Sequence, residues 1–508
     1  MAILTVPVRR PLDAGCVVLL ALSLAGWLAA CGGGGTAPLE PPPSQPSTPA
    51  SVSIISGGGA VDSAFAFLAT PLVVEVRASG GRVVAGTSVI FTGLSAVPDG
   101  PTTAYVSDPA VQVPRTDARL SVLTDGNGRA TIRVRLGLTA GPARVLVSAP
   151  AFQVTDTARY TVRAGQPATV RFAQSLAVLS AGDSTPVSAV VRDRWGNARP
   201  EAVSLRVLTP GATLSAGGRL LAPAPAVHRV EATGAGFADS MTAIVVPRAT
   251  IAFHDQGGGT VVMALDGREP RTIATGAGNC CEAPAWEPGG QALLLAGGDG
   301  LARGQVQRVP LTAPGAPFLT GNGAPAQQAW PRVAEAAPLV VYTGSGDGTT
   351  PRPWTSDASG AGSAPLPGLP AGAAWRATPS PDGTLIALVL GDSIAAGGQV
   401  RVYERGTQAL RAWAIAGDAP AFSPDGTRIA YVDRATRRLA VVAPDGTGAM
   451  AVSPPGRSYD PLAAVSWSRD GQWLYAATAD GVEMVRRSDA LVLPLPHLPG
   501  VRAVSERP

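Results

Sequence analysis

The sequence predicts an all-β protein, and three observations carry that prediction. A short motif ending in Asp-Gly recurs in the last half of the chain, and its glycine falls at 383, 426 and 471, a period of 43 and then 45 residues. A four-stranded propeller blade takes about 40–50 residues, so this period predicts a β-propeller. Before it, apolar and polar residues alternate in short runs, as half-buried strands require. The 61 Gly and 48 Pro residues supply many turns.

The bulk composition limits the class of protein. A chain of 508 residues is too long for one core and predicts about three domains. The net charge is only +4, and all 40 basic residues are Arg, as a GC-rich genome would give. These Arg residues stand singly or in pairs without interleaved aromatics, which argues against a nucleic-acid partner.

The N-terminus reads as a targeting segment. Arg9 and Arg10 precede an uncharged run over 14–30, so residues 1–30 are predicted to be a secretory signal peptide. The ending Leu-Ala-Ala-Cys resembles the lipobox of bacterial lipoproteins. That resemblance implies that Cys31 is the lipid attachment site, which makes the membrane a partner of the chain. An ordinary signal peptide with an incidental Cys is the alternative.

Residues 31–50 are predicted to be the lipidated Cys followed by a flexible Gly/Pro-rich tether. Extended at about 3.1 Å per residue, this tether reaches on the order of 60 Å. Gly32 follows the Cys, and in the enterobacterial sorting pattern a residue other than Asp there directs the protein to the outer membrane. We therefore expect a lipid-anchored protein of the cell envelope, on either the periplasmic or the surface face.

Two sandwich-like domains are predicted after the tether, over 51–163 and 164–247. Strand-like alternation is clear at Leu72–Arg77. The segments Thr124–Thr131 and Val187–Asn197 each join strand and turn signals, and they resemble bacterial Ig-like domains of the invasin/intimin kind. Such modules act as spacers or adhesive stalks.

The repeats over 249–508 resemble the blades of TolB-type, WD-repeat-like propellers. Phe422–Gly426 has the motif aromatic-Ser-Pro-Asp-Gly, and Trp467–Gly471 is a close copy. Ser380–Gly383 departs from it, with Pro379 in the aromatic position. In that family, TolB is a soluble periplasmic partner of a peptidoglycan-associated lipoprotein.

The number of repeats predicts six blades and a specific closure. Five openings are counted, with Trp286 and Trp330 taken as the first two, while the segment that starts at Ile251 has none. The C-terminal residues 502–508 resemble the missing opening. We expect them to complete the first blade by pairing with 251–254, which removes an exposed sheet edge.

One catalytic pattern is weighed and set aside. Gly391-Asp392-Ser393 resembles the Gly-Asp-Ser block of the SGNH esterases, in which the Ser is the nucleophile. A hairpin is expected after Ser393 instead of a helix. None of the three His residues follows an Asp at the required spacing, so no base is evident and we expect a loop. These residues are His228, His254 and His497.

Adjacent cysteines form the other unusual pair. Cys280 and Cys281 either form a vicinal disulfide or remain two thiols, and measuring free thiols on the unreduced protein separates these states. No His lies near them in sequence for a metal site. Calcium at Asp125 or Asp347 lacks an acidic ligand series. No cofactor is expected.

The predicted function is non-catalytic binding or scaffolding in the cell envelope, with the propeller as the interaction platform and an unidentified protein or glycan as partner. A cell-surface adhesin that uses the Ig-like domains is one alternative. A propeller-based hydrolase or lyase is another, although no converging set of charged channel residues is visible in the sequence.

The repeated Trp and Asp-Gly positions are assigned to packing and turns. A site is instead expected in the Cys280–Cys281 loop and in the inserts 310–328 and 343–374.

Overall fold

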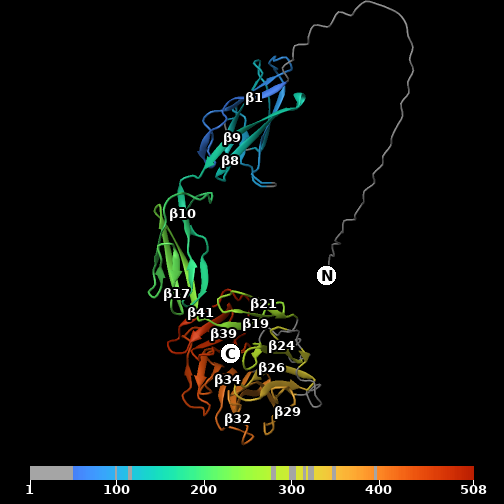
Figure 1. The fold of residues 1–508 in the computed structure, drawn as a ribbon, viewed down its shortest axis with the longest axis vertical. Helices are drawn as coiled ribbons and strands as arrows, with labels where there is room; N and C mark the ends of the chain where they lie inside the picture. The colour runs from blue at the N-terminus through green and yellow to red at the C-terminus, as the bar shows by residue number, and fades with distance from the viewer. Residues whose placement is uncertain are drawn as a thin grey trace, which may run out of the picture.

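The computed structural model describes residues 50–97, 100–111, 117–275, 282–296, 305–312, 316–317, 325–345, 350–393 and 397–508. Their regular structure is almost wholly β, which confirms the all-β prediction (Figure 1). In these ranges the one helix is the short 3-10 turn η1 (Pro150–Phe152), and no helix is long and apolar enough to cross a membrane. The predicted signal peptide, Cys31, Cys280 and Cys281 lie outside the described residues.

The first domain is a two-layered sandwich with strand orders β1-β3-β7-β5 and β2-β9-β8-β4-β6. Alternate residues of β7 are buried, so one face of each sheet meets the other in a single core that includes Val74, Phe91 and Val145. The strands are β1 (Ser51–Ser56), β2 (Val61–Ser63), β3 (Leu72–Arg77), β4 (Ser88–Gly93), β5 (Ala104–Ser107), β6 (Arg119–Leu123), β7 (Arg129–Leu136), β8 (Gly141–Ala149) and β9 (Val154–Arg163).

The second domain is also built from facing sheets. Its main sheet has the order β11-β18-β17-β14, and β10-β13 and β12-β16-β15 complete the domain. The strands are β10 (Pro167–Phe172), β11 (Leu176–Ser180), β12 (Ser184–Pro186), β13 (Ala189–Asp193), β14 (Ser204–Val207), β15 (Thr213–Leu214), β16 (Arg219–Leu221), β17 (Ala226–Gly234) and β18 (Phe237–Val246).

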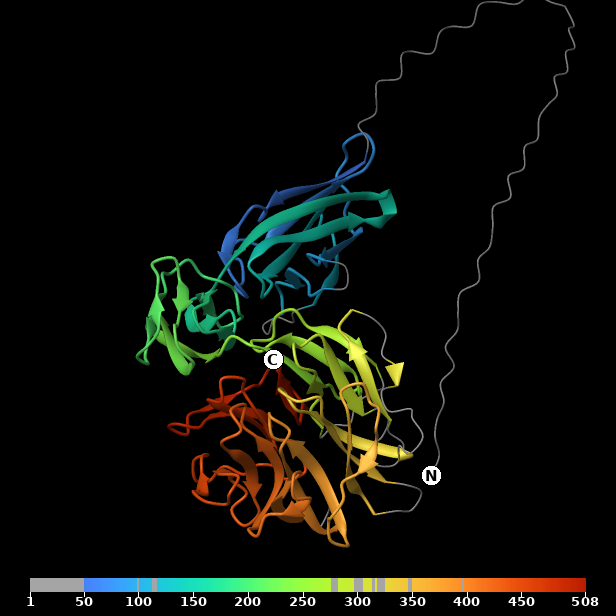
Figure 2. The same cartoon turned by 60° about the horizontal axis from the view of Figure 1, so that its bottom comes forward.

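The propeller follows directly, and in both views the two sandwiches extend from one side of it (Figures 1 and 2). Its described strands form four four-stranded sheets and one eight-stranded sheet, in which two four-stranded units are joined by pairing between β32 and β34. We call the four-stranded groups units 1 to 6 in chain order. Unit 1 contains β19 (Thr250–His254), β20 (Thr260–Ala264), β21 (Arg271–Ala274) and β42 (Val504–Glu506); unit 2 contains β22 (Ala285–Trp286), β23 (Ala292–Ala296), β24 (Val306–Pro310) and β25 (Ala316–Pro317).

Unit 3 contains β26 (Gln327–Val333), β27 (Val340–Ser345), β28 (Arg352–Ser356) and β29 (Ala364–Pro365); unit 4 contains β30 (Ala373–Pro379), β31 (Leu385–Ser393), β32 (Gly397–Glu404) and β33 (Ala409–Leu410). Unit 5 contains β34 (Ile415–Phe422), β35 (Ile429–Asp433), β36 (Leu439–Val442) and β37 (Met450–Ala451); unit 6 contains β38 (Ser466–Trp467), β39 (Trp473–Thr478), β40 (Gly481–Arg486) and β41 (Val492–Pro494).

The C-terminal strand closes the ring as predicted. β42 pairs antiparallel with β19, with Ala252 opposite Ser505 and Phe253 opposite Val504. The strand thereby becomes the innermost strand of unit 1. The predicted pairing between the chain end and 251–254 is confirmed.

The second sandwich and the propeller share a core and a buried polar contact. Ile244 of β18 packs in the same apolar cluster as Phe253 and Val501 of the propeller. Next to it, the buried Ser180 hydroxyl donates to Asp266 at 2.7 Å, and Arg268 donates to the same carboxylate at 2.9 Å. The two domains therefore meet through a packed interface and not only through a linker.

Replacing Asp266 with Ala is expected to weaken this junction. The change leaves the buried Ser180 hydroxyl without its acceptor, which should lower the free energy of unfolding by about 2–3 kcal/mol. Chemical denaturation would measure the loss, and proteolysis within 247–249 should become faster. Asp117→Ala, at an exposed carboxylate of the first sandwich, is the matched control. Equal stability of the two variants would contradict the expectation.

Candidate functional site: the mouth of the propeller channel

In units 4, 5 and 6 the Ser-Pro/Arg-Asp-Gly repeat forms the turn that follows the innermost strand. The Ser423 hydroxyl donates to Asp425 at 2.5 Å and accepts from the Arg428 N–H at 2.9 Å. The same pair of bonds recurs at Ser380 and Ser468. The Asp and Gly of the motif are thus used by the turn, as the sequence indicated.

The register of the strands corrects one repeat assignment. Trp286 pairs with Leu293, and the residue in the corresponding position of unit 3 is Val333, which pairs with Val340. Trp330 lies three residues earlier, so taking it as the copy of Trp286 is wrong. A β-bulge between Ala329 and Arg332 shifts the register of β26. The spacing of tryptophans in the sequence therefore does not match the spacing of equivalent strand positions in the structure.

Bulges at one level of the channel turn side chains toward its axis. Trp330, Arg376 and Ala419 occupy corresponding positions in units 3, 4 and 5, and each has a positive φ of 51–53°. Non-glycine residues rarely adopt this conformation, and bulges of this kind re-aim side chains near sites.

These re-aimed side chains close the channel. Arg376 reaches from unit 4 to the segment before β38, where it donates to the carbonyls of Pro461 at 2.6 Å and Leu462. Its guanidinium also lies 5.3 Å from the Trp330 ring centroid. The other side of this level is filled by three contacting alanines, Ala283, Ala464 and Ala503. The remaining space is about 10 Å³, enough for one water at most.

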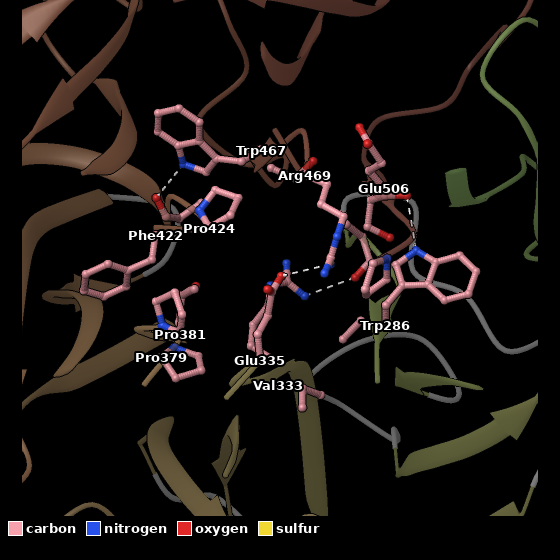
Figure 3. A pocket seen from close by; sticks show the side chains of 18 of the residues that line it. Trp286, Val333, Glu335, Pro379, Pro381, Phe422, Pro424, Trp467, Arg469 and Glu506 are labelled. Atoms are coloured by element: carbon pink, nitrogen blue, oxygen red, sulfur yellow. Dashed lines mark hydrogen bonds and ion pairs between the residues drawn. The ribbon is translucent and has the colours of Figure 1, made fainter. Parts of the chain in front are cut away.

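Above this constriction the channel widens into a cavity of about 170 Å³, which we call the mouth (Figure 3). Its walls are mostly proline and aromatic side chains from the innermost strands and their turns. The labelled examples in Figure 3 are Trp286, Pro379, Pro381, Phe422, Pro424 and Trp467. Because the constriction lies beneath it, the mouth is a blind pocket.

The floor of the mouth is polar. It is formed by the residue that precedes the aromatic position in each innermost strand; this residue is polar in four units and is Ala285 or Ala421 in units 2 and 5. Arg332 donates through one nitrogen to the carbonyls of Ala283 at 3.1 Å and Pro331 at 2.8 Å. Among the described residues, its other guanidinium nitrogens have no hydrogen-bond partner. The Ser505 Oγ is buried and likewise has no partner within the described ranges. Thr378 and Ser466 are the other polar residues of the floor.

Charges of both signs stand at the rim. Arg469 of unit 6 lies 3.9 Å from Glu335 of unit 3, so this pair spans the opening (Figure 3). Glu506 accepts from the Tyr475 hydroxyl at 2.7 Å, and burial raises the pKa of Glu506. The guanidinium of Arg507 lies 5.9 Å from the Trp286 ring.

A buried carboxylate lies at the level of the constriction. Glu282 is 2% exposed, and burial raises its pKa to about 7, although the nearby charges of Arg332 and Arg376 oppose the rise. Burial also lowers the pKa of Arg332, against the attraction of Glu282. Glu282 is thus partly protonated near neutral pH and neutralises Arg332 only in part.

The structure places the other predicted residues away from the mouth. Ser393 ends β31 and pairs with Gly397 of β32, so a hairpin follows it, as expected. Each His side chain makes a hydrogen bond within the protein: His228 with Thr209, His254 with Thr260, and His497 with the Leu265 carbonyl. In the described ranges no three His, Cys, Asp or Glu side chains gather as metal ligands would. Asp347 lies outside those ranges.

Sequence reasoning missed the mouth. It assigned the repeated positions to packing and turns and expected a site in the Cys280–Cys281 loop and in the inserts 310–328 and 343–374. The two cysteines lie outside the described residues, and no described residue of either insert lines the mouth. It also saw no converging charged residues, whereas the structure brings Arg332, Glu335 and Arg469 to one cavity. One signal was available: a polar residue directly before the aromatic position, as in Ser466-Trp467.

One family model matches part of the propeller. Residues 397–491 match the family described as "Lipoprotein LpqB beta-propeller domain". Solved structures with similar folds include TolB from Acinetobacter baumannii, at 13% identity over 67% of this chain and 99% of that chain with a TM-score of 0.40. Another is the putative TolB from Agrobacterium tumefaciens, at 16% identity over 49% of this chain and 88% of that chain with a TM-score of 0.38. No curated protein sequence matches the chain. Over 397–491, the chain is therefore similar to the propeller domain of LpqB-type lipoproteins.

Proposed function

We propose that this protein is a lipid-anchored, non-catalytic binding protein of the cell envelope. On this proposal it binds its partner at the mouth of a six-bladed propeller. The match to an LpqB lipoprotein propeller and the lipobox-like sequence at Cys31 support the anchor. The two sandwich domains, which we take to be Ig-like, hold the propeller away from an outer membrane surface. The shared core between β18 and the propeller supports this spacer role.

The observation that carries the binding role is the blind mouth itself. Its walls are apolar, while its floor presents Arg332 and the buried Ser505 hydroxyl with unused hydrogen-bonding capacity among the described residues. Pockets that bind ligands combine an apolar lining with a few placed polar groups in this way. The partner on this proposal is an envelope protein.

Site-specific photo-cross-linking in native membranes tests the proposal. A photoreactive amino acid at Pro381, on the mouth wall, is expected to capture a reproducible partner. The same probe at Met450, an exposed residue of the outer strand β37 at 59% exposure, is the matched control. Equal capture at the two positions, or no captured species at Pro381, would contradict an envelope partner bound at the mouth.

A further inference from the structure

The shape of the mouth limits what part of a ligand enters it. The constriction leaves only about 10 Å³, so nothing threads through, and the space above it is about 170 Å³. A cavity of about 150 Å³ holds one benzene ring, so this space corresponds to roughly one side chain. A blind pocket of this size accommodates the end of a chain and not its middle.

The innermost strands are also poorly suited to strand addition. Corresponding positions of units 2, 3 and 5 carry Pro284, Pro331 and Pro420. Proline has no N–H to donate to an added strand. A peptide ligand is therefore held by its side chains and its terminus and not by extension of a sheet.

The polar groups of the floor favour a chain end that carries a negative charge. Arg332 keeps guanidinium donors without a partner among the described residues, and the buried Ser505 hydroxyl, which lines the same cavity from unit 1, lacks one there as well. An arginine fork and a hydroxyl donor match the two oxygens of a carboxylate. Glu282 does not lie within ion-pair distance of Arg332 in the described part of the chain, so it leaves the guanidinium available.

We infer that the mouth binds the C-terminal residue of a polypeptide, with its carboxylate on Arg332 and Ser505 and its side chain against the proline and aromatic walls. The inference rests on the proposed binding function and adds the chemical identity of the bound group. Charge-assisted hydrogen bonds of this kind are the strong ones, so removing the ligand's negative charge has a large effect.

Fluorescence anisotropy with the detergent-solubilised full-length protein tests the inference. The probes are two mixtures of fluorescein-labelled hexapeptides randomised at the last three positions, one with a free C-terminal carboxylate and one with a C-terminal amide. The free-acid mixture is expected to bind at least about tenfold more tightly. Arg332→Gln should abolish this difference. Arg487→Gln, which removes an exposed charge on unit 6, should retain it.

Further arms keep the test decisive if Arg332→Gln folds poorly. Ser505→Ala, a smaller change, is expected to weaken free-acid binding by about threefold without changing amide binding, and thermal unfolding of each variant checks its fold. Equal binding of both mixtures to the unmodified protein, or a difference that survives in a folded Arg332→Gln variant, would overturn the inference. So would binding of galacturonate or inorganic phosphate with binding of neither peptide mixture.

The two proposals fail separately. Capture of a partner at Pro381 with no preference for free carboxylates would retain the binding function and overturn the inference. A clear carboxylate preference that disappears in Arg332→Gln, with no cross-linked species in membranes, would support the site and overturn the proposed envelope partner.

Discussion

Replacing Glu282 with Gln is expected to stabilise the propeller at pH 8 by on the order of 3 kcal/mol and to have little effect near pH 4.5. The reason is that burial raises the pKa of this carboxyl group from 4.5 to about 7. Each unit of pKa difference between folded and unfolded chain corresponds to about 1.4 kcal/mol.

The sign follows from the two protonation states. Below the unfolded pKa, Glu282 is neutral in both states and imposes no penalty. Between pH 4.5 and 7 the unfolded chain ionises first, so the folded state loses stability as the pH rises. A Gln side chain has a similar shape and never ionises, so its advantage grows over this window and is complete above pH 7.

Thermal unfolding at pH 4.5, 6 and 8 measures this effect. We expect the melting temperature of Glu282→Gln to exceed that of the unmodified protein by several degrees at pH 8. Glu269→Gln, at an exposed carboxylate, is the control for the change in net charge. A pH-independent difference, or the same shift in both variants, would show that Glu282 is not held in a neutral form by burial.

The elements set by local pattern could be predicted from the sequence. The alternation of Leu72–Arg77 is that of β3, and the Ser-Pro-Asp-Gly segments form turns because Ser, Asp and Gly satisfy the local backbone. The pairing of residues 502–508 with unit 1 was also predictable, since the chain end carries a copy of the repeat and a ring leaves one strand edge to fill.

The channel could not be predicted in the same way. A bulge adds residues to one strand without changing the apolar pattern, so the period alone assigned Trp330 to a position that Val333 occupies. Arg332 and Ser505 are 173 residues apart in sequence and line one cavity only because the ring closes. In the sequence each resembles an ordinary strand residue. Only a comparison of the units shows that both occupy the position directly before the aromatic one.

Removing the C-terminal residues 502–508 is expected to have the largest effect on the fold, because β42 supplies contacts to three units. Within unit 1 it pairs with β19. Toward unit 2, the Ser505 carbonyl accepts from the Trp286 ring N–H at 3.3 Å, and toward unit 6, Glu506 accepts from Tyr475 at 2.7 Å. We expect the truncated protein to lose the cooperative unfolding of its propeller, while the first sandwich domain, which has a core of its own, remains resistant to protease.

A single substitution separates closure from loss of chain length. Val504 is 1% exposed in the core shared with the second sandwich, so Val504→Asp buries a charge without a partner, which destabilises by about 3–5 kcal/mol. Met450→Asp, on the exposed outer strand β37, should change stability by less than about 0.5 kcal/mol. Similar melting curves for these two variants would mean that the ring holds together without β42. β42 contributes Ser505 to the floor of the mouth, so in that case the shape of the floor would not depend on the pairing of β42 with β19.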